Sequence, residues 1–175
     1  MKFLTILLLA FLVLAGCAED RRASFPGEPL IGPFKSMQNY KQVEEIIITN
    51  GLQPRDFSHE LLARDEKHLS NGLVKIVVTN YSDLGITGKV YLTLFYNRLE
   101  SVMFEPQPVA DYVERLIRTN RLNFSEKPIN PISRRALVSS NVVVEIVSPP
   151  SGRPFVRWTD IRLEKESSRW IYQNF

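Results

Sequence analysis

The chain has 175 residues, the size of a single domain, and carries 22 Lys and Arg against 19 Asp and Glu. A formal net charge of +3 is too mild to indicate a nucleic-acid partner. One cysteine excludes an intrachain disulfide, so packing has to hold the core. This is feasible, because a domain near 150 residues buries about 68–70% of its extended-chain surface.

The first residues have the layout of a secretory signal. Met1 and Lys2 give a positive start, and Phe3–Leu14 is apolar apart from Thr5. A bilayer-spanning helix needs about 20 apolar residues, and this run is shorter. We therefore expect residues 1–16 to be a signal peptide that is removed.

The four residues Leu14-Ala15-Gly16-Cys17 resemble the lipobox of bacterial lipoproteins. The resemblance implies cleavage between Gly16 and Cys17, a thioether-linked diacylglycerol on the Cys17 sulfur and an acyl chain on its freed amine. Two or more chains anchor a protein stably, so a membrane would be its first partner. In enteric bacteria, an aspartate directly after the lipidated cysteine retains a lipoprotein in the inner membrane. This chain has Ala18 there, so the resemblance implies attachment to the outer membrane, with the domain facing the periplasm. The alternative is an ordinary secreted protein with a chance cysteine.

Residues 17–35 are expected to form the lipidated N-terminus and a tether, because they contain three prolines and two glycines without periodicity. Fully extended, residues 18–35 would span at most about 60 Å. The remaining residues, 36–175, are expected to form a single globular α+β domain.

Helical periodicity and end signals predict a first helix over 36–50, with Ser36 as N-cap and Gly51 as its stop. A second short helix is expected within 54–67. No transmembrane segment is expected after the signal.

Three strands are predicted next, over 73–79, 89–96 and 99–105. The middle one alternates clearly and carries large apolar groups on both faces, so it is expected to be central. The third would return antiparallel after a tight turn at 97–98.

In the C-terminal half, the sequence pattern predicts a helix from Pro106 to Thr119 and a long loop over 123–135. Strands are predicted over 137–147 and 155–158. A final helix over 159–171 would be capped by Thr159, with Asp160 in its first turn. The expected fold is therefore α+β: a small, mostly antiparallel sheet of about five strands packed with three or four helices, in the order α(α)βββαββα.

Sequence signatures of catalysis and metal binding were tested and none is complete. His59 is followed at the fourth position by Ala63, where a metalloprotease helix needs a second histidine, and His68 is nine residues away. Neither a serine-nucleophile elbow nor a P-loop is present. We expect no metal, no cofactor and no enzyme activity, although remote carboxylates could still converge in the fold as in a small hydrolase.

A binding surface is predicted at Arg134, Arg135, Arg153, Arg157 and Trp158, since arginine and aromatic groups together favour interfaces and planar anionic or sugar-like ligands. The alternative is ordinary surface arginines around a core tryptophan. Strand alternation favours that alternative, because it places Arg157 and Trp158 on opposite faces.

Residues 36–105 are expected to form one or two helices followed by three antiparallel strands that include the 94–99 segment LFYNRL. In this pattern they resemble small outer-membrane lipoproteins of the BamE/SmpA type. The resemblance implies attachment to larger envelope-assembly machinery without catalytic residues. We therefore expect a non-catalytic binding or scaffold module in the periplasm, with an envelope protein or cell-wall partner and no nucleic acid. The alternatives are the carboxylate hydrolase and a lipid or small-ligand carrier, which would need a sizeable apolar pocket.

Overall fold

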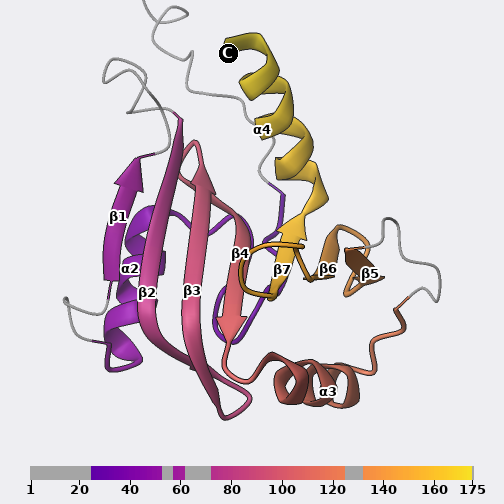
Figure 1. Ribbon diagram of the computed structural model, residues 1–175. Coiled ribbons are helices and arrows are strands. Elements are labelled where there is room, and N and C mark those ends of the chain that lie inside the picture. The colour runs from indigo at the N-terminus through magenta and orange to yellow at the C-terminus, as the bar shows by residue number, and fades with distance from the viewer. Residues whose placement is uncertain (1–24, 53–56, 62–71, 125–131, 175) are drawn as a thin grey trace, which may run out of the picture.

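The computed structural model describes residues 25–52, 57–61, 72–124 and 132–174 and shows an α+β fold with one antiparallel sheet (Figure 1). Within these residues the sheet has seven strands and is accompanied by three helices. The strands are β1 (Phe57–Leu61), β2 (Leu73–Asp83), β3 (Ile86–Phe95), β4 (Arg98–Pro106), β5 (Ser133–Leu137), β6 (Val142–Val147) and β7 (Phe155–Asp160), and the helices are α2 (Tyr40–Thr49), α3 (Val109–Asn120) and α4 (Ile161–Asn174).

The strand order is β1-β2-β3-β4-β7-β6-β5. The chain runs as an antiparallel meander from β1 to β4, crosses through α3 to the opposite edge at β5, and returns through β6 to β7. The pairing of β4 with β7, from Ser101 opposite Thr159 to Phe104 opposite Val156, joins the two halves into one sheet.

The mostly antiparallel α+β class is confirmed, whereas the expected strand count and order are wrong. The described elements run αββββαβββα, with seven strands instead of about five. The second helix expected within 54–67 is contradicted by β1, which pairs with β2. Residues four apart, such as Phe57 and Leu61, lie on the same face both in a helix and in a strand. The spacing of these apolar residues therefore could not distinguish the expected helix from the observed strand.

The single strand expected over 137–147 is two strands, β5 and β6, joined by a tight turn. The backbone N–H groups of Val138 and Ser139 both donate to the Val142 carbonyl across this turn. Strand β5 begins at Ser133, inside the loop expected over 123–135; residues 125–131 of that loop lie outside the described residues.

The first and last helices begin later than predicted. Asn39, not Ser36, caps α2: its side chain accepts from the Gln42 N–H, and the Gln42 side chain accepts from the Asn39 N–H. Strand β7 continues through Asp160, so α4 starts at Ile161 instead of following a Thr159 cap. None of the helices in the described part of the chain is long and apolar enough to cross a membrane.

The hydrophobic core lies on one face of the sheet. Strand register places Leu92, Val102, Trp158 and Val144 next to one another on this face. Helices α2 and α3 cover it; Tyr112 of α3 is fully buried. In Figure 1, α2 and the indigo N-terminal segment lie behind the sheet.

Residues 25–36, which we call the strap, belong to this core. Leu30, Ile31 and Phe34 are 6%, 4% and 1% exposed, and Leu30 N–H donates to the Phe34 carbonyl at 2.9 Å. The prediction that the whole of 17–35 is a tether is therefore wrong for the strap. Gly32 and Pro33 form a turn, and Pro29 pairs with Lys35 as an isolated antiparallel bridge, so the strap folds back on itself with its apolar side chains in the core.

Candidate functional site

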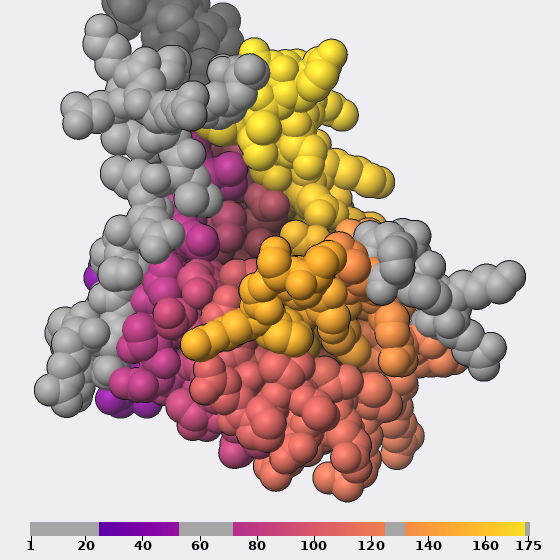
Figure 2. Space-filling model, viewed as in Figure 1, coloured from indigo at the N-terminus to yellow at the C-terminus, as the bar shows by residue number. Residues whose placement is uncertain are grey.

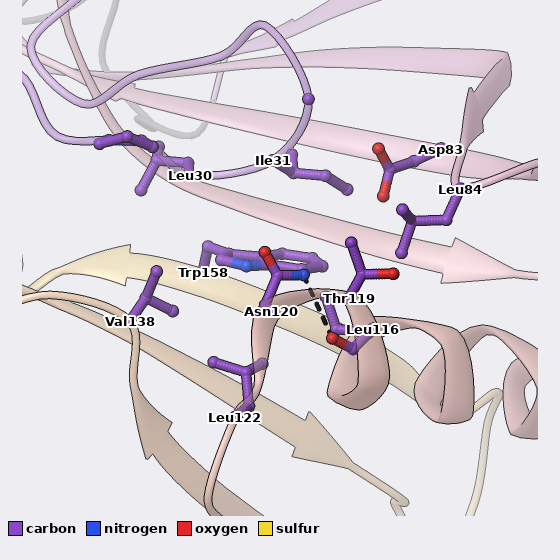
Figure 3. Close-up of a pocket in the computed structure, with 12 residues that line it drawn as sticks. Leu30, Ile31, Asp83, Leu84, Leu116, Thr119, Asn120, Leu122, Val138 and Trp158 are labelled. Carbon is purple, nitrogen blue, oxygen red and sulfur yellow. Dashed lines mark hydrogen bonds between the residues drawn. The ribbon is translucent and has the colours of Figure 1, made fainter.

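A cavity of about 260 Å³ opens between the strap, the β2–β3 turn, the end of α3 and the β5–β6 turn (Figure 3). The Trp158 indole extends across it, with strap residues on one side and α3 residues on the other. Its wall is mainly apolar, formed by Leu30, Ile31, Leu84, Leu116, Leu122, Val138 and Trp158.

Asp83, at the end of β2, places a carboxyl group on the wall of this cavity. Burial raises the pKa of this carboxyl, and the Tyr112 hydroxyl, which donates to its Oδ2 at 2.7 Å, opposes that rise. Burial, with Asp83 adding to it, likewise raises the pKa of Tyr112, so its phenol stays a proton donor. The core thus holds the carboxyl group through Oδ2, and the Leu84 backbone N–H also donates to it. The carboxyl group remains a hydrogen-bond acceptor in the cavity wall.

A second acceptor comes from the end of α3. The Asn120 amide nitrogen donates to the Leu116 carbonyl at 3.2 Å, which turns the side-chain oxygen toward the cavity (Figure 3). Two acceptors in an apolar wall suit a mainly apolar molecule with an N–H or O–H group. The volume is at the small end for ligand pockets, so the molecule would be the size of one or two rings.

The cavity depends on a close approach of the strap to β2. Gly32 has a φ of 51°, and a Cβ there would lie 2.4 Å from the Tyr81 hydroxyl oxygen. Only glycine combines this left-handed backbone with the absence of a side chain. Gly32 therefore lets the strap close one side of the cavity.

The structure separates the residues of the predicted arginine surface. Arg135 and Arg157 flank Glu145 across three neighbouring strands, at 3.3 and 2.6 Å. Burial opposes ionisation of Glu145, but hydrogen bonds, led by that from Arg157, lower its pKa. The two arginines are thus held in a local ion-pair ladder, on the face opposite Trp158.

The other members of that predicted surface lie elsewhere. Arg134 stacks over the Phe124 ring at 5.5 Å, and Arg153 is exposed in the β6–β7 connection. Trp158 is 2% exposed and belongs to the core and the cavity. These five residues therefore do not share one surface, and Trp158 alone contributes to the candidate site.

Two carboxyl groups do converge, at the junction of the strap with α4. Arg162 donates to Asp160 at 2.6 and 3.0 Å and lies 3.6 Å from Glu28. Burial alone would raise the pKa of Asp160, but the hydrogen bonds from Arg162 outweigh burial, so the pKa of Asp160 is lowered. Hydrogen bonds from Ser139 and Asn141 lower the pKa of Glu28. A general acid needs a pKa near the working pH, so this pair is suited to structure and not to hydrolysis.

Glu100 is a third buried carboxyl, 8% exposed, where β4 meets α4. Burial raises its pKa to about 7, with Glu164 adding to the rise and a Ser167 hydrogen bond opposing it. It does not line the cavity. Sequence reasoning missed Asp83, Tyr112 and Glu100 because nothing in their local pattern marks them as buried partners.

The remaining predicted site residues are not tested by the structure. Gly16 and Cys17 lie outside the described residues, as does His68. Within the described ranges, no group of three or more His, Cys, Asp or Glu side chains could hold a metal ion.

No protein-family model matches the sequence, and neither a curated protein nor a solved structure matches the chain.

Proposed function

We propose that this chain is a lipid-anchored lipoprotein of the bacterial envelope, held at the outer membrane through Cys17 and facing the periplasm. Its domain is a non-catalytic binding module, and the cavity over Trp158 is its ligand site. The anchor rests on the lipobox-like segment 14–17. The observation that carries the binding function is an apolar cavity with the Asp83 carboxyl and the Asn120 oxygen in its wall.

The preferred ligand is a small, mainly apolar molecule with one N–H or O–H group. The apolar body would displace water from the walls formed by Leu30, Leu122 and Trp158, and its donor would reach Asp83 or Asn120. An anionic ligand is disfavoured, because it would meet acceptors only. This chemistry favours a small-ligand carrier over a purely scaffolding module.

1-Naphthylamine, a neutral two-ring aromatic amine, is a fluorescent probe of matching size and chemistry. The chain has two tryptophans, so Trp170→Phe leaves Trp158 as the only indole. We expect saturable quenching of Trp158 emission with energy transfer to the bound probe. Unsaturable quenching would overturn the assignment.

A cavity-filling pair of variants makes this test specific. Val138→Phe places a ring at the cavity wall, whereas Leu137→Phe changes its exposed neighbour, which does not line the cavity. We expect Val138→Phe to abolish probe binding and Leu137→Phe to retain it. Equal binding by both variants would show that the probe binds elsewhere.

The anchor is tested separately by mass spectrometry of protein extracted from membranes of the native host. The expected N-terminal fragment begins at Cys17 and carries the mass of a diacylglycerol and an acyl chain. An intact Met1 or a free thiol would overturn the lipoprotein proposal and leave the cavity test unaffected.

A further inference from the structure

Helix α4 is only partly packed against the sheet. Leu163 and Ser167 are buried against the domain, but the C-terminal half of the helix extends past the end of the sheet (Figure 1). In Figure 2 the yellow helix stands above the other coloured elements. Ile171 is 41% exposed and Tyr172 is 90% exposed.

The outer face of this helix combines positive and aromatic side chains. Lys165, Arg169 and Tyr172 follow at spacings of four and three, so they form one exposed stripe. Within the described part of the chain neither cation forms an ion pair, whereas the acidic Glu166 is bound by Arg98 at 2.6 Å. Exposed cations of this kind are attracted to anionic lipid headgroups, and a tyrosine suits the membrane interface.

Trp170, next to Arg169 in the sequence, packs this part of α4 against the domain. Its ring lies 5.9 Å from Phe95 and 6.0 Å from Tyr96, centroid to centroid. This aromatic cluster attaches the protruding half of α4 to the β3–β4 turn. The stripe is therefore presented on a supported helix, with an indole close enough to report on its surroundings.

The described fold begins beside the first turn of α4. The Arg162 guanidinium lies 4.9 Å from the Phe25 ring centroid, and its Nη2 donates to the Pro26 carbonyl at 3.4 Å. Only residues 18–24 separate Phe25 from Cys17. At 3.3–3.6 Å per residue, that stretch spans at most about 28 Å.

This length limits how far the domain can stand from its anchor. The 14 residues of α4 extend over about 21 Å, starting where the chain enters the fold. The whole helix thus lies within reach of a bilayer that holds Cys17. A tether running through residue 35 would have permitted twice that distance, but the strap is bound to the core.

We propose that the outer face of α4, formed by Lys165, Arg169 and Tyr172, lies on the anionic surface of the same bilayer that anchors Cys17. The proposal rests on the lipid anchor proposed above. The two cations contact acidic phospholipid headgroups, and the Tyr172 side chain enters the headgroup boundary. The partner surface is lipid, and not a second protein.

The lipidated full-length chain, reconstituted in vesicles of phosphatidylethanolamine and phosphatidylglycerol with brominated acyl chains, provides the test. Bromine quenches indoles that lie at the interface, so we expect a loss of Trp170 emission relative to unbrominated vesicles. Trp170→Phe should remove this loss, because Trp158 is buried in the core. Vesicles of phosphatidylcholine, which lacks net charge, should give weaker quenching.

Charge reversal at exposed positions gives a matched pair of variants. Lys165→Glu with Arg169→Glu should abolish the quenching, whereas Lys41→Glu with Arg118→Glu, exposed on α2 and α3, should retain it. If the anchored protein shows no quenching of Trp170, the α4 proposal is overturned. Equal quenching in both double variants would overturn it as well. Neither result would contradict the lipid anchor at Cys17. Absence of acylation at Cys17 removes the anchor and this proposal together.

Discussion

Two carboxyl groups near α4 are buried to a similar degree and behave in opposite ways. Asp160 is 0% exposed, and the hydrogen bonds from Arg162 keep its pKa below the usual value in spite of burial. Glu100 is 8% exposed, and burial raises its pKa to about 7, because no arginine in the described part of the chain donates a hydrogen bond to it and the Ser167 hydrogen bond and the charges of Arg157 and Arg98 oppose the rise only in part. Burial therefore does not decide the charge of a carboxyl group; the availability of a guanidinium partner does.

Removing the partner of Asp160 should have the largest effect. Arg162→Ala leaves a carboxylate without its cation in the core, which typically costs about 3–5 kcal/mol in the free energy of unfolding. Denaturant titration at pH 7 measures the loss. Arg153→Ala, at an exposed loop position, is the control and should change stability by less than about 0.5 kcal/mol.

Removing the charge of Glu100 should have the opposite sign. Its pKa is raised on folding, so the native state binds the proton more tightly and stability falls as the pH rises from about 4.5 toward 7. Glu100→Gln should therefore stabilise the protein by up to about 3 kcal/mol at pH 8 and have almost no effect at pH 4. Thermal unfolding across this pH range checks it, and a pH-independent effect would contradict the buried-carboxyl account.

Releasing Arg98 should make Glu100 resemble Asp160. In Glu166→Gln the guanidinium loses its 2.6 Å partner and becomes available to Glu100, so the pKa of Glu100 should fall. The net change in stability at pH 7 should stay below about 1 kcal/mol, because the lost ion pair is partly exposed. Carboxyl carbon NMR of Glu100 measures the pKa directly; an unchanged value would show that Arg98 has no access to it.

Removing the charge of Glu28, the second carboxylate near Arg162, should have only a small effect on the free energy of unfolding. Glu28 lies 3.6 Å from Arg162, and a glutamine there keeps an acceptor oxygen for Ser139 and Asn141, so Glu28→Gln should cost only about 1 kcal/mol, well below Arg162→Ala. Parallel denaturant curves for the two variants test this ranking. Equal losses would mean that Glu28, and not Asp160, is the main partner of Arg162.

Elements with strong periodicity were predictable from the sequence. The strand predicted over 89–96 from its alternation corresponds to β3, and the apolar stripe predicted after Pro108 corresponds to α3. Strand β1 was not predictable, because its apolar spacing fits both structures. Strand β5 was hidden by the polar pair Arg134-Arg135 at a sheet edge, where one face is solvated.

The candidate site was predictable only in part. Trp158 stood out by residue type, but its role as a cavity wall depends on the strap, whose prolines and glycines suggested a tether. The bond between Asp83 and Tyr112 joins residues 29 positions apart and follows from how α3 packs on the sheet. Contacts of that kind are set by tertiary packing and leave no local signature.

The strap also constrains the order of assembly. Glu28 accepts hydrogen bonds from Ser139 and Asn141, which follow it by 111 and 113 residues. Because these two bonds close a loop of more than a hundred residues, the attachment of the strap to the β5–β6 turn is expected to be a late and slow step of folding.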